Sequence, residues 1–254
     1  MDKIQLSLDR EILSFLSQRD SPVGAVQLSV LFGRKFGVSQ ATIGRKLLQM
    51  DYEGYTKKMK KMGRCITDKG LKYLNELDRA LKQEEVWTEF LNALKSVDIQ
   101  GVIDILVARR GLERESAFLA AKNADEKDIQ EMEDVLKHQL QIITEKSTGG
   151  DDEDRNFHRL IAEASKNNVL VKAITLIREQ NTLALHLATI RKMIGGNIYH
   201  DHEQILDRIK AKDSEGASRA METHINNMIK EFKNYELRFA NKESNKAKEG
   251  CLDD

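Results

Sequence analysis

The stretch HEQILDRIKAKDSEGASRAMETH, from His202 to His224, predicts two antiparallel helices joined by a tight turn. Apolar residues recur at helical spacing on both sides of its middle, ending at Ile209 and resuming through Met221. Asp213 in the middle supplies the turn and a cap, because its side chain accepts hydrogen bonds from free N–H groups of the next helix. His202 and His224 each lie 11 residues from Asp213, so antiparallel packing brings the two imidazoles to the same level. Two imidazoles at the same level could both coordinate one metal ion.

Further ligands are offered by Asp154 and His158, which are four residues apart and therefore share one face of a helix. With His202 and His224 they give one carboxylate and three imidazoles from three helices. This set suits zinc, nickel, manganese or iron, and it leaves coordination positions for water or a ligand. The alternative is that each histidine is an ordinary core or surface residue, which is the interpretation we give to His138, His186 and His200.

Composition favours a helical protein of two domains. The 254 residues include one proline, 15 glycines and 6% aromatic residues, and 32% are charged. The two cysteines, Cys65 and Cys251, have neither disulfide-framework nor zinc-ribbon spacing, which indicates a reducing compartment. No run approaches the roughly 20 apolar residues of a membrane span, and the N-terminus lacks the order of a signal peptide. We therefore expect a soluble cytoplasmic protein without a membrane partner.

Charge is unevenly divided between the two ends. Residues 1–80 carry 15 Lys and Arg against 9 Asp and Glu, although the net charge of the whole chain is zero. A basic module joined to an acidic one indicates that the first meets a polyanion. Within it, a helix from Ala25 to Phe36, a turn at Gly37 and a helix capped by Ser39 describe a helix-turn-helix.

The segment KKMKKMGRCIT, which begins at Lys57, predicts a two-stranded β-wing. A lysine run is often only a solvated strand, but this one follows a helix-turn-helix in the basic half of the chain. We expect Ser39, Gln40, Thr42 and Arg45 to read bases in the major groove of double-stranded operator DNA. Lysines and arginines would contact phosphates, adding affinity without sequence preference; these are Lys46, Lys57, Lys58, Lys60, Lys61 and Arg64.

The expected fold is mainly α, with an N-terminal winged helix-turn-helix that carries a small β-wing and a C-terminal all-α bundle of six or seven helices. The domains are residues 1–80 for DNA binding, 81–95 for a connecting helix, 96–238 for the bundle and 239–254 for a polar, disordered tail. One bundle helix is expected from Val169 to Met193.

Four motifs give the bundle a family resemblance: R-R-G-L-E-x-E-S-A-F-L-A-A from Arg109, D-x-x-F-H from Asp154, A-S-x-N-N-V-L from Ala164, and H-x(10)-D-x(3)-A-x(6)-H from His202. The bundle resembles the C-terminal ligand-binding (FCD) domain of FadR-type GntR transcription regulators. The resemblance implies that Asp154, His158, His202 and His224 coordinate a divalent metal ion, with zinc first among the candidates. It also implies that Arg109 faces the cavity and pairs with an effector carboxylate.

The first domain departs from the usual GntR pattern. Its motifs F-G-V-S-x-A-T-I-G-R-K-L and G-R-x-I-T-x-K-G resemble those of other bacterial and archaeal winged helices.

These observations predict a homodimeric, ligand-responsive transcription regulator rather than an enzyme, with a small organic acid as effector. One alternative is a metal sensor, or a metal-stabilised regulator, without an organic effector. The other is a metal-dependent hydrolase, for which the bundle offers no motif that supplies a general base.

Overall fold

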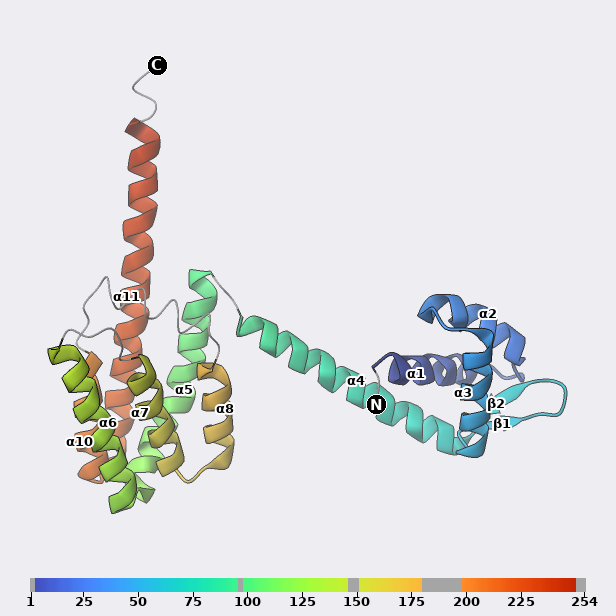
Figure 1. The fold of residues 1–254 in the computed structure, drawn as a ribbon, viewed down its shortest axis with the longest axis horizontal. Helices are drawn as coiled ribbons and strands as arrows, with labels where there is room; N and C mark the ends of the chain where they lie inside the picture. The colour runs from blue at the N-terminus through green and yellow to red at the C-terminus, as the bar shows by residue number, and fades with distance from the viewer. Residues whose placement is uncertain (1–2, 96–97, 146–150, 180–197, 250–254) are drawn as a thin grey trace. The chain divides into compact units, whose positions relative to one another are not determined.

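The computed structural model describes residues 3–95, 98–145, 151–179 and 198–249 of the chain (Figure 1). The chain divides into two compact units, Met1–Phe90 and Leu91–Asp254, each with its own apolar core. Within the described ranges, no helix has a stretch long and apolar enough to cross a lipid bilayer.

The N-terminal unit is a winged helix-turn-helix, as the sequence predicts. Its elements are α1 (Lys3–Ser17), α2 (Ala25–Phe36), α3 (Gln40–Tyr52), β1 (Thr56–Lys58), β2 (Arg64–Ile66) and the first half of α4 (Asp68–Ala93). The core is formed by apolar side chains of all four helices, among them Ile12, Leu28, Leu47 and Leu74.

The turn between α2 and α3 follows from two residues. Gly37 has φ +64°, a left-handed conformation that ends α2 without the steric cost of a side chain. Ser39 then begins α3, because its hydroxyl accepts a hydrogen bond from the N–H of Thr42 at 3.2 Å. These two residues fix the direction in which α3 leaves the turn.

The β-wing is a two-stranded antiparallel ribbon in which Thr56 pairs with Ile66 and Lys58 with Arg64. Val23 pairs with β2 as well, exchanging two backbone hydrogen bonds of 2.9 Å with Arg64. Gly63 has φ +126°, and a Cβ there would lie 2.4 Å from the Val23 backbone, so only glycine fits this position.

The connecting segment is part of one long helix. α4 begins at Asp68 and continues without a break through residues 81–93, since no Pro or Gly interrupts it after Gly70. The segment expected as a connecting helix thus lies in the second half of α4.

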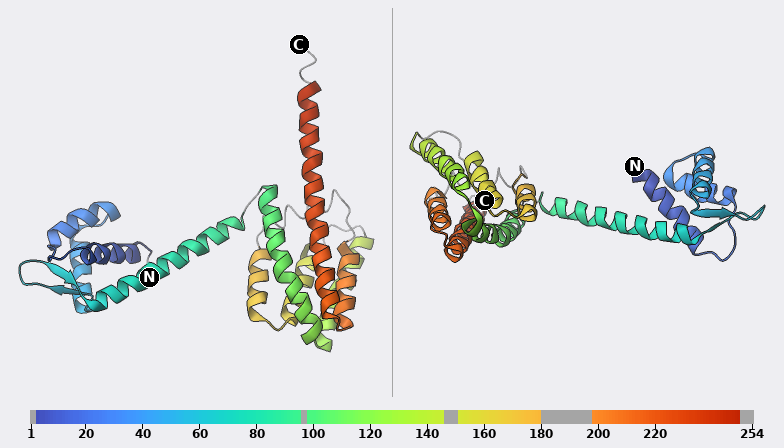
Figure 2. Two further views of the ribbon diagram at one scale, coloured as in Figure 1. Left: turned by 180° about the vertical axis from the view of Figure 1, so that it is seen from behind. Right: turned by 90° about the horizontal axis from the view of Figure 1, so that it is seen from below.

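The C-terminal unit is an all-α bundle. Its described helices are α5 (Ile99–Asn123), α6 (Glu126–Thr144), α7 (Asp151–Ala164), α8 (Asn168–Arg178), α10 (Ile198–Lys210) and α11 (Ser214–Glu249). α5 and α11 lie side by side, with α7 and α8 against α5 and α10 against α11 (Figures 1 and 2). α8 is the described part of the helix expected from Val169 to Met193; residues 180–197 lie outside the described ranges.

The chain end differs from the expected disordered tail. α11 continues through Glu249, and only residues 250–254 lie outside the described ranges. The segment between residue 232 and Gly250 contains neither Pro nor Gly and is rich in Lys, Glu and Ala, which are good helix formers. The polarity of this segment suggested disorder, but its residues have a high helix propensity, and the segment is helical.

Candidate functional site

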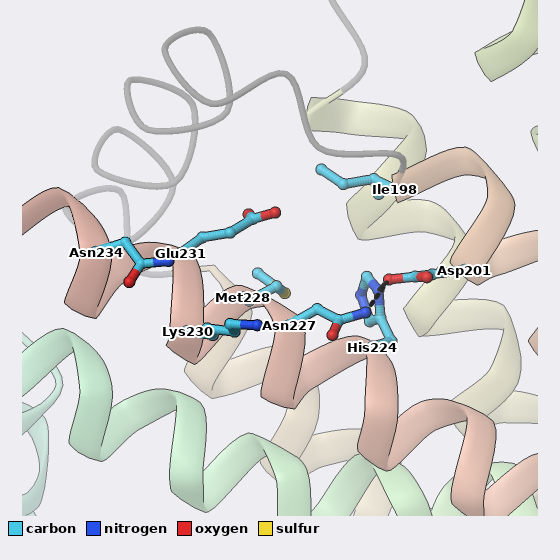
Figure 3. Close-up of a pocket in the computed structure, with 8 residues that line it drawn as sticks. All are labelled: Ile198, Asp201, His224, Asn227, Met228, Lys230, Glu231 and Asn234. Atoms are coloured by element: carbon cyan, nitrogen blue, oxygen red, sulfur yellow. Dashed lines mark hydrogen bonds and ion pairs between the residues drawn. The ribbon is translucent and has the colours of Figure 1, made fainter.

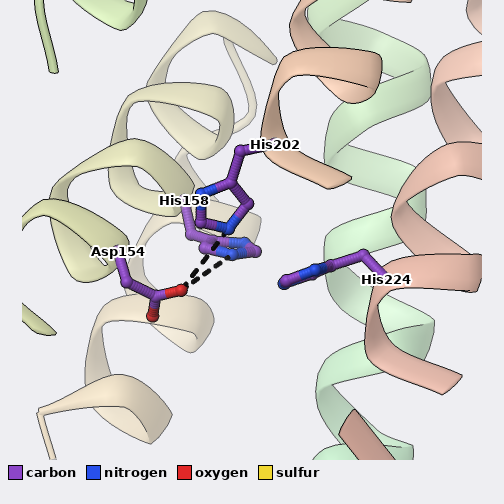
Figure 4. A group of neighbouring side chains, drawn as sticks. All are labelled: Asp154, His158, His202 and His224. Carbon is purple, nitrogen blue, oxygen red and sulfur yellow. Dashed lines mark ion pairs between the residues drawn. The ribbon is translucent and has the colours of Figure 1, made fainter. Parts of the chain in front are cut away.

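Four side chains converge inside the C-terminal bundle (Figure 4). Asp154 and His158 come from α7, His202 from α10 and His224 from α11, and one ligand atom of each lies within 4.8 Å of the others. All four are buried, with at most 3% of the residue exposed. The structure thus brings together the four residues that the sequence selects as metal ligands.

The hairpin of α10 and α11 places its two histidines at one level, with ring centroids 4.8 Å apart. Asp213 makes the turn, because its Oδ1 accepts the N–H of Gly216 at 2.8 Å. A Cβ at Gly216 would lie 2.0 Å from Oδ2 of Asp213, so a larger residue there would make the Asp213 side chain shift. The equal spacing of 11 residues from Asp213 predicted that these two imidazoles lie close together, and they do.

Each histidine is oriented through its Nδ1 atom. Nδ1 of His158 lies 2.6 Å from Oε2 of Glu113. Nδ1 of His202 lies 3.1 Å from Oε1 of Gln139, and Nδ1 of His224 lies 3.3 Å from Oδ2 of Asp201. The oxygen acceptors beside His202 and His224 keep the proton on Nδ1, which directs the lone pair of each Nε2 into the centre.

The three Nε2 atoms have no hydrogen-bond partner in the part of the chain that the structure describes. Those of His202 and His158 face Oδ1 of Asp154 at 3.4 and 3.7 Å. Lone pairs and a carboxylate oxygen that face one another in a dry interior repel, and a cation between them turns this repulsion into coordination. The donor set of three nitrogens and one oxygen fits a divalent transition metal.

Burial also keeps the imidazoles of His202 and His224 in the neutral form that binds metals. Desolvation lowers the pKa of His202 to about 3, and it lowers the pKa of His224 as well. Both side chains are therefore unprotonated at neutral pH, the state in which Nε2 is a ligand.

Below neutrality we expect the metal-free protein to lose stability. An unfolded imidazole takes up a proton near pH 6.5, whereas His202 in the folded state resists protonation until about pH 3. Its contribution is thus complete above about pH 6.5 and decreases as the pH falls from there toward 3, by up to about 1.4 kcal/mol per pH unit. Urea unfolding at pH 7.5, 6 and 5 measures this slope. It should be smaller in His202→Asn, and an equal slope in that variant would contradict the prediction.

Two buried arginines and one glutamate surround the ligands. Glu113 accepts hydrogen bonds from Nε of Arg109 at 2.6 Å and from Nη1 of Arg178 at 3.1 Å. Burial alone would raise the pKa of Glu113, but Arg109 and His158 lower it to about 2, so it is ionised. Nη2 of Arg178 donates to Oδ2 of Asp154 at 2.5 Å, which leaves Oδ1 directed at the histidines.

Arg109 therefore has a protein carboxylate as its partner, whereas the sequence assigned it to an effector. Sequence reasoning also missed four residues that hold the ligands. Glu113 lies four positions after Arg109 in the same quoted motif, and Asp201 is next to His202, so local spacing offered a signal for these two. Gln139 and Arg178 reach the centre from α6 and α8, and no local pattern marks them.

A pocket of about 300 Å³ borders His224 (Figure 3). We call it the α10–α11 pocket; it is lined by Ile198, Asp201, His224, Asn227, Met228, Lys230, Glu231 and Asn234. It lies on the side of the imidazole that contacts Asp201, and the amide of Asn227 donates to the same carboxylate at 3.2 Å. The volume is sufficient for a small organic molecule.

Most of the residues expected at a DNA interface are on the surface of the N-terminal unit. Ser39, Gln40 and Arg45 are exposed at the start of α3, and Thr42 is half-buried. Four wing lysines are exposed as well: Lys57, Lys58, Lys60 and Lys61.

Lys46 and Arg64 differ from the expectation, because both are buried. Nζ of Lys46 lies 3.0 Å from Oδ1 of Asp9 inside the helical core. Nε of Arg64 donates to both oxygens of Asp51, at 3.0 and 2.9 Å. Each cation is needed to neutralise a neighbouring carboxylate, so neither is available to a phosphate.

Replacing Lys46 should therefore reduce stability and not DNA binding. Lys46→Met leaves Asp9 buried without its cation, which should lower the free energy of unfolding by about 3 kcal/mol. Lys35→Met is the matched control, because Lys35 pairs with Glu11 at 2.7 Å on the surface with 55% of its side chain exposed, and such pairs contribute about 0–1 kcal/mol. Urea unfolding measures both variants, and equal losses would show that the Asp9 pair has no special role.

The other described histidines take no part in the centre. His138 and His200 are more than half exposed, and His138 contacts Glu153 at 2.8 Å. His186 lies outside the described ranges.

Comparison with known proteins agrees with this two-part architecture. Residues 104–227 match the FCD domain, and residues 10–74 match the Ribonuclease R winged-helix domain. At the level of class, the chain thus joins a winged-helix unit to a bundle that matches the FCD domain. That the first unit departs from the usual GntR winged helix stays a prediction.

Individual proteins with known names are similar to this chain. The chain is 32% identical over 135 residues to the Uxu operon regulator of Haemophilus influenzae, covering 50% of each protein. It is 31% identical over 146 residues to the Uxu operon transcriptional regulator of Escherichia coli, covering 53% of this chain and 56% of the relative. The solved structure of E. coli McbR/YncC is 17% identical, covers 92% of this chain and 100% of that one, and has a TM-score of 0.48.

The chain spans about half the length of these two curated relatives. Both are named as operon regulators.

Proposed function

We propose that the chain is a ligand-responsive transcription regulator that binds double-stranded DNA through its winged helix and holds a divalent metal ion in its bundle. The observation that carries the metal is the convergence of three buried Nε2 atoms with Asp154. The names of its relatives support the regulatory role. Zinc is the first candidate for the ion, with nickel, manganese and iron as the others.

A small carboxylate is the effector that the charge balance favours. The buried charges of Arg109 and Arg178 are compensated by those of Glu113 and Asp154. A divalent cation adds two positive charges, of which Asp201 offsets one. One anionic ligand then completes the neutralisation, and four protein ligands leave coordination positions for its oxygens.

The α10–α11 pocket supports this effector, because it lies beside His224 and contains Asn227 and Lys230 as donors. Arg109 can bind an effector only if its pairing with Glu113 changes. An effector carboxylate that pairs with Arg109 has to displace Glu113, which in turn releases Nδ1 of His158. Effector binding would then reach a metal ligand directly.

Regulation requires that the effector bind the DNA-competent and DNA-incompetent forms with different affinities. A homodimer would present two winged helices to the half-sites of a two-fold symmetric operator. Coupling is then a shift between two dimer conformations, and either sign is compatible with the residues.

Elemental analysis of the protein purified without added metal, with mass spectrometry of any co-purifying small molecule, tests the metal and the acid together. About one equivalent of a transition metal per chain is expected. A DNA duplex selected from a random pool should then bind with an affinity that changes when the identified acid is added. Metal-free protein with unchanged DNA binding in every acid tested would contradict the proposal.

A metal sensor without an organic effector is the second candidate. Burial of all four ligand residues favours it, because a closed site resembles a structural or sensing centre more than an open one. In that case the metal alone changes DNA affinity, and carboxylates have no effect on the metal-loaded protein.

A further inference from the structure

Arg178 holds the metal centre with only part of its guanidinium. Its Nη1 and Nη2 atoms contact Glu113 and Asp154, as described above. Its Nε has no hydrogen-bond partner among the residues that the structure describes, although only 6% of the residue is exposed. A desolvated N–H donor without an acceptor is costly, and native proteins seldom leave one. An acceptor supplied by a ligand would satisfy it.

Arg178 also lines a second pocket, outside the metal centre, with a volume of about 420 Å³. We call it the α7–α8 pocket. Two further guanidinium groups line it from α7, those of Arg155 and Arg159, together with the amide of Asn156. From α8 come the hydroxyl of Thr175 and the side chain of Ile174, which is buried. Five of the eight lining side chains can therefore donate hydrogen bonds.

In the part of the chain that the structure describes, the two surface arginines form exposed ion pairs. Arg155 contacts Asp152 and Arg159 contacts Glu163 at 2.7 Å, each within α7. Both arginine side chains are more than 40% exposed, and such pairs contribute little stability. A ligand anion can therefore compete for these cations at small cost. Asp152 and Glu179, which also line the pocket, select against ligands of high negative charge.

We propose that the α7–α8 pocket binds a small mono- or dicarboxylate, with one oxygen accepting from Nε of Arg178 and the other end held by Arg155 and Arg159. This site is separate from the metal-coordinated effector of the proposed function. Carboxylates suit it because a guanidinium presents coplanar N–H groups that match their oxygens.

Arg178 couples this pocket to the metal centre, and this part of the inference rests on the proposed function. Any shift of its guanidinium toward the pocket alters the hydrogen bond to Oδ2 of Asp154 and the pair with Glu113. Arg178 is thus a positioning residue for a metal ligand. By linkage, the anion changes the metal affinity by the same factor by which the metal changes the anion affinity.

The test is calorimetric titration of the metal-loaded full-length protein with succinate, with acetate and inorganic phosphate as comparison probes. In Arg155→Gln/Arg159→Gln we expect the affinity for succinate at this site to fall at least about tenfold, the loss that one charge-assisted hydrogen bond predicts. The metal content should not change. Arg114→Gln is the matched control, since Arg114 is 49% exposed on α5 and pairs with Glu222.

The outcomes separate this inference from the proposed function. Succinate binding that is lost in His224→Asn but retained in Arg155→Gln/Arg159→Gln overturns the inference and leaves the metal-bound effector in place. Binding that is lost in the arginine variant but retained in His224→Asn supports the pocket and contradicts a metal-bound acid. No binding of any probe at 10 mM, or equal binding in the arginine variant and Arg114→Gln, refutes the pocket as a carboxylate site.

Discussion

Removal of the divalent ion should lower the thermal unfolding midpoint by roughly 10 °C. The ion binds only the folded chain, because its ligands come from three helices that are brought together by folding. An ion present at a thousandfold excess over its Kd stabilises by about 4 kcal/mol, and each kcal/mol corresponds to about 2–4 °C for a domain of this size. Calorimetric scans before and after treatment with EDTA measure the difference, and added zinc should restore it.

A histidine pair gives this prediction its control. His202→Ala should abolish both the bound metal and the response to EDTA, because it removes one of four ligands and leaves a polar cavity. His200→Ala should leave both unchanged, since His200 is two residues away, 54% exposed and paired with Glu203 at the surface. If EDTA has no effect and the two variants behave alike, the cluster is a buried hydrogen-bonding group and not a metal centre.

The ligand set could be predicted because helices and hairpins impose simple spacing. A separation of four residues puts Asp154 and His158 on one face, and equal separations from Asp213 bring His202 and His224 together. Both rules use only the number of residues that separate two positions in the sequence. The same rules could not find Gln139 or Arg178, because these approach the centre from helices whose packing depends on the whole bundle.

The DNA-binding surface was predicted less completely for a related reason. Lys46 was expected to contact phosphates because of its charge, but it lies three and four positions from Ile43 and Met50 on the buried side of α3. A lysine there requires a buried acid, and Asp9 on α1 supplies it from 37 residues away. Arg64 was likewise counted with the wing lysines, although it is buried and paired with Asp51. Charge locates a basic module, while burial decides which cations remain free.

The largest effect on DNA binding should come from the wing. Replacing Lys57, Lys58, Lys60 and Lys61 by serine is expected to weaken DNA binding about a thousandfold near physiological salt, if each lysine neutralises one phosphate. Each neutralised phosphate contributes about 0.9 to the slope of log affinity against log salt, so the slope should decrease by 3 to 4 units. All four lysines are exposed on or beside the turn between β1 and β2. Fluorescence anisotropy with a labelled duplex at 50–300 mM salt measures both quantities.

Sequence preference should survive this change, because phosphate contacts position the protein and base contacts specify the site. Arg45→Ala should show the opposite pattern, with discrimination between duplexes reduced and the salt slope lowered by at most about one unit. The matched control replaces four exposed lysines of the bundle by serine, namely Lys122, Lys127, Lys137 and Lys172. These substitutions remove the same formal charge from the chain, so an equal loss of affinity would mean that net charge, and not the wing, attracts the DNA. An unchanged slope in the wing variant would exclude these lysines from the interface and leave α3 as the contact surface.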